Sequence, residues 1–182
     1  VVLPFTSAIL RLIKSFIRVP FDESSNLGRV SALNPVLLAT PDRALVCAAR
    51  ELMHSGEKIE VMLRSVGTLY DTWNEKIAES ISINDVQVRE SNFQTKLYLS
   101  KLNRNDFEED VRKKSIELSA VAVDLDSASD TIARNMVELA ERLDAEAVKF
   151  SVSGQKEISD FHDRVLANVQ LALQVMMTQS PN

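Results

Sequence analysis

A heptad pattern through residues 111–143 constrains the fold of this chain more than any other feature of its sequence. Apolar residues recur every seven positions, and a second row that includes small residues follows four positions behind. Such a repeat buries one stripe of an α-helix, and small residues on that stripe let a neighbouring helix come close. We therefore predict one long helix that packs along most of its length. The first row is Val111, Leu118, Leu125, Ile132 and Leu139, and the second is Ser115, Ala122, Ser129, Met136 and Leu143.

The composition favours long helices. The chain has 182 residues, enough for one proper core. It contains 4 glycines and 5 prolines, and 5% of its residues are aromatic, values that argue against a turn-rich β fold. Cys47 is the only cysteine, which excludes an internal disulfide or a cysteine-rich zinc site. The sequence has no glycine-rich phosphate loop and no nucleophile motif, so we expect no enzymatic activity.

The charge distribution is uneven. The first twenty residues hold three of the 21 basic residues and none of the 26 acidic ones, so the remainder has a net charge of −8. Nucleic-acid binding needs a basic surface, and we therefore expect no nucleic-acid partner.

Residues 41–70 are predicted to form the first long helix. Thr40 suits the N-cap position, and Pro41 suits the first helical position. Gly56 and Gly67 lie inside this helix, where each costs about 1 kcal/mol of helix propensity relative to alanine. We expect these glycines at points where another helix approaches closely.

Two more helices complete the pattern. A second helix is predicted from near Asn84 to Leu102, and the heptad helix begins near Asp106. A further helix follows the break FSVSG at residues 150–154, where Ser151 or Ser153 can cap it. Long helices with short connections form antiparallel bundles, so we predict an all-α fold of that kind. The inward residues predicted for the second helix are Val86, Phe93, Leu97 and Tyr98.

The chain opens inside an apolar run, as expected for a piece of a longer protein. Arg11, Lys14 and Arg18 share one helical face of this run. A basic amphipathic segment suits a membrane surface or the cytoplasmic end of a spanning helix, and a helix packed on the body is the alternative. We interpret residues 1–20 as the end of a membrane region, 21–40 as a linker and 41–182 as the helical bundle.

Asp126 and Asp130 lie four residues apart, on a stripe beside the heptad seam. Like charges at this spacing cost an isolated helix about 0.2–0.5 kcal/mol, so the carboxylates are either solvated, salt-bridged or bound to a shared cation. Hard divalent metals prefer carboxylate oxygens. One hypothesis is thus a divalent metal or iron at this stripe, and the other is an ordinary helix flank.

Several stretches of the chain resemble PhoU-like domains. Residues 33–66, beginning LNPVLLATPDRAL, resemble the family's opening helix, and NDVQVR with KLYLSKL looks like its second helix. DLDSASD resembles an element of the third helix, and residues 150–158 resemble the start of the next repeat. Together with the PF segment at residues 4–12, they look like the cytoplasmic tail of bacterial sodium/phosphate cotransporters.

The resemblance implies a PhoU-like three-helix repeat plus one further helix, with the second repeat incomplete. It implies a cytoplasmic regulatory or binding domain of a sodium-dependent phosphate transporter, at the bacterial inner membrane as part of an integral membrane protein. Expected partners are its own transmembrane transport domain, the membrane surface and a second copy of the chain. The alternative is a free-standing PhoU-type regulator of phosphate uptake that binds metal.

The family's metal signature, E/D-x-x-x-D, adds one more candidate residue. Asp126 and Asp130 match it on the third helix, and on the second helix Asp85 is followed by Arg89 in place of a carboxylate. A cation there removes a ligand and repels a metal. The resemblance therefore leaves two hypotheses, a metal held by Asp85, Asp126 and Asp130, or an inter-helix ion pair from Arg89 to Asp126 or Asp130.

Overall fold

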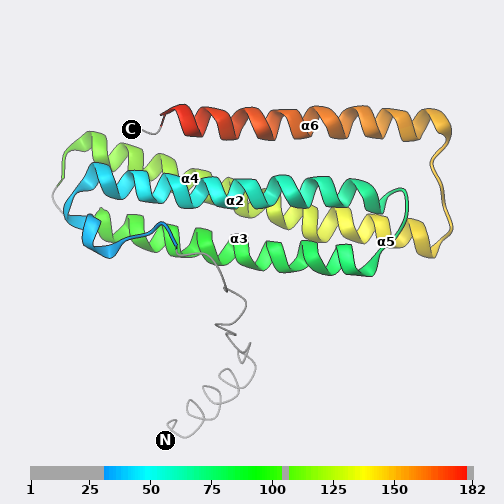
Figure 1. Cartoon of the computed structure of the whole chain (residues 1–182), viewed down its shortest axis with the longest axis horizontal. Helices are drawn as coiled ribbons and strands as arrows, with labels where there is room; N and C mark the ends of the chain where they lie inside the picture. The colour runs from blue at the N-terminus through cyan, green and yellow to red at the C-terminus, as the bar shows by residue number, and fades with distance from the viewer. Residues whose placement is uncertain (1–30, 104–106, 180–182) are drawn as a thin grey trace, which may run out of the picture. The chain divides into compact units, whose positions relative to one another are not determined.

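The computed structural model describes residues 31–103 and 107–179, and within these ranges the chain forms helices and no strand (Figure 1). The predicted all-α bundle of long helices is confirmed. Successive long helices run in opposite directions, and α4, η3 and α5 together form one continuous helix. The elements are η2 (Pro35–Ala39), α2 (Pro41–Leu69), α3 (Glu75–Leu102), α4 (Glu109–Asp130), the π-helical η3 (Thr131–Met136), α5 (Val137–Ala145) and α6 (Val152–Gln179).

Helix α2 lies at the centre of the bundle and contacts α3, α4 and α6. It begins at Pro41, as predicted, and ends at Leu69. Thr40 occupies the N-cap position, although its side chain makes no capping hydrogen bond. The apolar core divides into two clusters along this helix. One includes Ala44, Leu45, Cys47, Ala48, Leu99 and Leu102, and the other includes Ile59, Met62, Leu63, Val66, Ile81 and Val88.

The end of the predicted linker is bonded to the bundle. The Glu51 carboxylate accepts hydrogen bonds from Ala32 N at 2.8 Å and from Ser91 Oγ of α3 at 2.7 Å. The Tyr98 hydroxyl donates to Asn34 O at 2.8 Å, and burial, with a smaller effect from the nearby Cys47, raises the pKa of Tyr98. Residues 31–40 are therefore part of the folded body, whereas residues 1–30 lie outside the described residues.

Helix α3 begins nine residues before the predicted start. The Asn74 side chain accepts hydrogen bonds from the backbone N–H groups of Lys76 and Ile77, which caps the helix at this point. Ile77 and Ile81 then extend the apolar core, so the additional turns are held by packing. The sequence pattern missed this start because one capping asparagine stands between two weakly periodic segments.

The predicted inward face of α3 is wrong at three of four positions. Tyr98 is buried, but Val86, Phe93 and Leu97 are 41–56% exposed. The stripe that faces the core carries several polar residues, so hydropathy alone pointed to the wrong side of the helix. The buried stripe consists of Ile81, Asp85, Val88, Asn92, Thr95, Tyr98, Leu99 and Leu102.

The predicted long third helix is confirmed over residues 109–145, with one change in its phase. The small residues of the second row, Ser115, Ala122 and Ser129, are fully buried. The π-helical turn η3 holds about one residue more than an α-helical turn. After η3, the residue that faces the core therefore comes one position later than the heptad predicts. After η3, Ala140 is buried at 1% exposure, and Leu139, the position predicted from the heptad, is 37% exposed.

Helix α6 packs on α2 at the two glycines, as predicted. A Cβ atom at Gly56 would overlap Leu173 Cδ2, and one at Gly67 would lie 3.0 Å from His162 Nε2. The start of α6 is capped by Ser151, whose Oγ accepts a hydrogen bond from Gly154 N at 3.1 Å. The glycines thus set how closely these two helices approach.

The contact between Gly56 and Leu173 predicts a coupled pair of mutations. Alanine is favoured over glycine in a helix by about 1 kcal/mol, but the new methyl group needs the space that Leu173 occupies. We expect Gly56→Ala to raise the free energy of unfolding by about 1 kcal/mol in a Leu173→Ala background, and by less in the native background. Urea denaturation of the four chains measures this difference, and equal effects in both backgrounds would contradict the packing.

Candidate functional site

A row of buried polar side chains, here called the polar seam, runs through the interface of α2, α3 and α4. Each is at most 3% exposed, and burying a polar group is costly unless it is hydrogen-bonded. Along α2 and α3, Ser55 and Asn92 fall between the two apolar clusters of the core. The seam therefore departs from the usual pattern of a bundle core. Its residues are Ser55, Asp85, Asn92, Thr95, Ser115 and Ser129.

The polar seam is built in layers one heptad apart. In one layer, Ser129 Oγ of α4 lies 2.7 Å from Asp85 Oδ1 and 3.8 Å from Met62 Sδ of α2. In the next layer, Asn92 Nδ2 donates to Ala122 O at 3.2 Å. Because heptad-spaced positions fall on the same helix face, one contact in each layer fixes the register of its neighbours.

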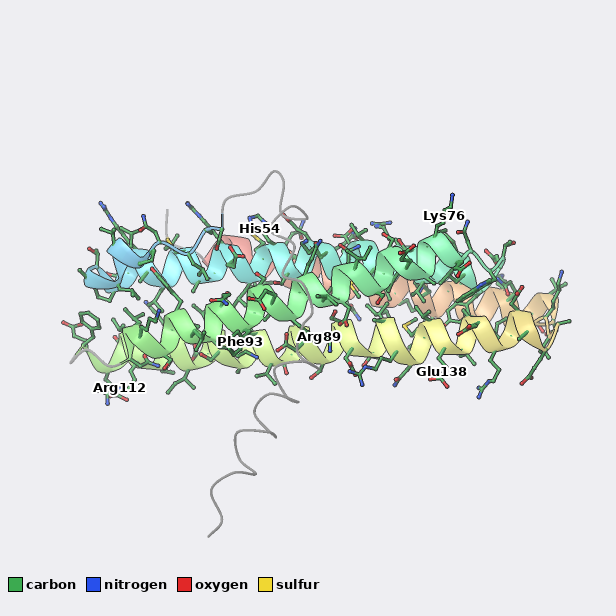
Figure 2. All side chains as sticks on the ribbon, turned by 90° about the horizontal axis from the view of Figure 1, so that it is seen from below. His54, Lys76, Arg89, Phe93, Arg112 and Glu138 are labelled. Carbon is green, nitrogen blue, oxygen red and sulfur yellow. The ribbon has the colours of Figure 1, made fainter. Side chains whose placement is uncertain are left out.

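Asp85 is the buried carboxylate of the seam, at 3% exposure. It accepts the hydrogen bond from Ser129 Oγ, and its other oxygen is paired with Arg89, one turn later on α3. Figure 2 shows Arg89 on α3, with α4 and α5 running below that helix in this view. A charge buried this deeply needs both partners, because a buried carboxylate without partners is strongly unfavourable.

Asp126 joins α4 to α3. Its two oxygens accept hydrogen bonds from Asn92 Nδ2 at 2.8 Å and from Lys96 Nζ at 2.7 Å. Its side chain is half-buried, so the attraction to Lys96 is less screened than that of a fully exposed pair. Asn92 bonds both Asp126 and Ala122 O and therefore ties the outer ion pair to the polar seam.

Asp130 pairs with Arg134 of the same continuous helix, at 2.7 Å from Nε. Each of the three carboxylates predicted as metal ligands therefore has a cationic partner of its own. Arg89 forms an ion pair with Asp85 of its own helix, and Lys96 and Asp126 form the ion pair between helices. The structure therefore corrects the expected ion pair from Arg89 to Asp126 or Asp130. Arg89 pairs with Asp85 instead, because residues four apart on a helix are neighbours.

The carboxylates are not gathered around one point in the structure. Within residues 31–103 and 107–179, no group of three or more His, Cys, Asp or Glu side chains is placed to hold a metal ion. Asp85 is deeply buried between helices, while Asp126 and Asp130 lie on the flank of theirs.

Sequence reasoning missed three residues that complete the site. Asn92 and Lys96 hold Asp126, and Ser129 holds Asp85. The sequence did contain a signal for the buried face of α3. Asp85, Asn92 and Leu99 are spaced seven residues apart and lie on the inward stripe of this helix. The apolar residues on the opposite face obscured it.

Three buried polar atoms of the seam have no hydrogen-bond partner within the described chain: Ser55 Oγ, Asn92 Oδ1 and Ser115 Oγ. Met62 contacts Ser129, and Asn92 bonds to Ala122, one heptad before Ser129 on α4. Ser55 is one heptad before Met62 on α2, so it falls in the same layer as Asn92. Buried polar groups between helices favour one register over others, because a shift would separate paired groups. The polar seam can therefore specify the register in which these helices pack.

The basic face formed by Arg11, Lys14 and Arg18 lies outside the described residues. In the part of the chain that the structure describes, no helix is both long and apolar enough to cross a bilayer.

The Asp85–Ser129 contact predicts a selective loss of stability. Ser129→Ala removes the hydroxyl that donates to a buried carboxylate, so we expect the free energy of unfolding to fall by about 1–3 kcal/mol. Ser127→Ala is the matched control, since Ser127 is exposed on the same helix, and should change stability by less than about 0.5 kcal/mol. Urea denaturation tests both, and similar losses in the two variants would rule out the special role of Ser129.

The ion pairs predict the response to metals. Because Asp85, Asp126 and Asp130 are already paired with cations, we expect Mn²⁺ or Fe²⁺ to leave the melting temperature unchanged. A metal present at a hundred times its Kd would instead stabilise the fold by about 2.7 kcal/mol. Thermal melts with metal and with chelator make the comparison. A metal-dependent rise that Asp126→Ala abolishes would support the metal hypothesis.

Comparison with known proteins gives relatives over nearly the whole chain. A protein of Escherichia coli (strain K12) named "Putative inorganic phosphate export protein YjbB" is 28% identical over 184 residues, which cover 98% of this chain and 32% of that protein. The protein of the same name from Salmonella typhimurium is 29% identical over 177 residues, covering 96% of this chain and 32% of its own length.

No family model and no solved structure matches this chain. The chain spans about a third of the length of the curated relatives it matches. It is therefore similar, nearly from end to end, to one part of larger proteins that are named for phosphate transport.

Proposed function

We propose that this chain is a regulatory or binding domain of a phosphate transport protein, held at the cytoplasmic face of a bacterial inner membrane. The observation that carries the proposal is the similarity of 98% of the chain to a third of a protein named for phosphate export. The PhoU-like motif series and the basic apolar segment at residues 1–20 support the same assignment.

In the fuller form of the proposal, the parent protein couples phosphate movement to sodium. The resemblance of the motif series to the tails of sodium/phosphate cotransporters favours this coupling. The names of the relatives refer to export, whereas cotransport with sodium ordinarily serves uptake. The direction of transport is therefore the first quantity that an experiment on the parent protein has to measure.

The charge of the body favours regulation over direct handling of phosphate. Four basic and two acidic residues precede Ser31, so residues 31–182 hold 17 of the 21 basic and 24 of the 26 acidic residues, a net charge of −7. Such a body repels a phosphate anion. The domain would act on the transport part of the protein by contact, without carrying the ion.

The described side chains support a binding role without chemistry of its own. The carboxylates of the candidate site are bonded to Arg89, Lys96, Arg134, Ser129 and Asn92, which leaves them poorly placed to act on a substrate. Outside the core, α3 presents a row of exposed apolar residues, and such patches commonly mark interaction sites. The row is Ile83, Val86, Phe93 and Leu97.

The proposal predicts that the domain changes phosphate flux. Cells expressing the complete parent protein, with and without residues 31–182, are assayed for phosphate uptake and export, with and without sodium. We expect deletion to change the flux by about fivefold or more, the lower range of typical coupling between sites. Phe93→Asp should reproduce this change, whereas Val61→Asp, on α2 and equally exposed, should not.

Two outcomes would contradict the proposal. If the flux is the same with and without the domain, the domain does not regulate transport. If the parent protein is found in the soluble fraction and moves no phosphate, the free-standing PhoU-type regulator becomes the better assignment. Flux that responds to the domain but not to sodium would reject the sodium-coupled form alone.

A further inference from the structure

Residues 31–40, here called the strap, lie beside α2 and α3 (Figure 1). No residue of the strap is buried, and its leucines pack only at the edge of an apolar cluster of the core. An element with few buried apolar contacts opens locally at a lower free energy than the core of the same protein. The strap can therefore open while the rest of the bundle stays folded. These leucines are Leu33, Leu37 and Leu38.

The carboxylate of Glu51, on α2, bonds the strap and α3 at the same time. Its Oε2 atom accepts hydrogen bonds from Ala32 N at 2.8 Å and from Ser31 Oγ at 3.2 Å, both in the strap. Its Oε1 atom accepts a hydrogen bond from Ser91 Oγ of α3 at 2.7 Å. Hydrogen bonds to a carboxylate are stronger than those between neutral groups. A movement of α3 that pulls Ser91 away therefore disturbs the group that also holds the strap.

A second contact bonds the strap to α3 one heptad further along that helix. The hydroxyl of Tyr98, which is 5% exposed, donates to Asn34 O at 2.8 Å. The Leu37 amide donates to the same carbonyl at 3.1 Å, so this oxygen also holds the first turn of η2. Ser91 and Tyr98 are seven residues apart, a spacing that places them on one side of α3. The strap is therefore tied to one side of α3 at two levels.

The same turns of α3 also bond to α4. Asn92, which directly follows Ser91, and Lys96 both donate to Asp126 of α4. A helix moves as a rigid element, so its contacts on different sides are displaced together. A shift of α3 that separates it from Asp126 therefore also strains the two contacts that hold the strap.

We propose that the strap opens and closes with the position of α3, and that it couples the bundle in this way to the part of the protein before Ser31. The inference rests on the proposed function, in which the domain regulates a transport part, and it names the element through which the regulation acts. A partner bound to the exposed apolar row of α3 shifts this equilibrium when it binds the open and closed states with different affinity.

Hydrogen exchange in the complete 182-residue chain tests whether the strap opens as one unit. Tyr98→Phe removes the bond to Asn34 O, and we expect the amide of Ala32, which bonds to Glu51, to exchange about tenfold faster. Tyr70→Phe is the matched control, since its hydroxyl bonds to Met136 O, and it should leave this rate unchanged. An unchanged rate in Tyr98→Phe, or equal acceleration by both substitutions, would overturn the proposal.

A second variant keeps the test decisive if loss of the Tyr98 hydroxyl loosens the core. Glu51→Ala should speed exchange of the Leu37 amide by about tenfold, although that amide bonds to Asn34 O and not to Glu51. Glu57→Ala, at an exposed position of the same helix, is the matched control and should leave the rate unchanged. Exchange of Leu37 that does not depend on Glu51 would show that the strap does not open as a unit.

Phosphate flux through the complete parent protein separates this inference from the proposed function. Glu51→Ala should change the flux in the same direction as deletion of residues 31–182, whereas Glu57→Ala should not. If the deletion changes the flux and Glu51→Ala does not, the coupling through the strap is rejected and the proposed function stands. If the deletion leaves the flux unchanged, the proposed function fails, and the regulatory role of the strap fails with it.

Discussion

The burial of one carboxylate sets the constraint on which the rest of the bundle depends. Asp85 lies in the core, where a carboxylate without partners is strongly unfavourable. Ser129 must therefore lie opposite it on α4, and Arg89 must reach it along α3. Once this layer is in place, heptad spacing brings Asn92 to Ala122 and leaves Asp126 within reach of Lys96.

This register gives each carboxylate of the motif a partner within the protein. Helix α3 brings a cation to each of Asp85 and Asp126, and Asp130 finds Arg134 on its own helix. Asp85 and Asp126 thus join α3 to α4, and among the described residues the apolar row of α3 is a surface that stays exposed to other molecules. Such a row suits binding of a helix or a protein face better than binding of phosphate, which an acidic body repels.

The sequence pattern predicted α2 and the long third helix well because their periodicity is strong and Pro41 marks a clear start. It failed for α3, where Phe93 and Leu97 point outward and Asn92 and Thr95 point into the core. It also placed Leu139 inward, since a π-helical turn leaves no evident mark in the heptad pattern. Asp85, Asp126 and Asp130 were predicted as metal ligands, which stays a prediction, and the cationic partner that the structure gives each of them was not predicted.

The sequence by itself determined the helical class, the order of the helices and the close approach at Gly56 and Gly67, because these depend on local propensity and on spacing along one chain. The pairs of Asp85 with Arg89 and of Asp130 with Arg134 are local to one helix. The tertiary structure decided which face of α3 is buried, which cation Asp126 meets and which hydroxyl Asp85 meets. Those outcomes depend on groups 30 to 44 residues apart in the chain, such as Asp126 with Lys96 and Ser129 with Asp85, whose meeting is set by the register of one helix on another.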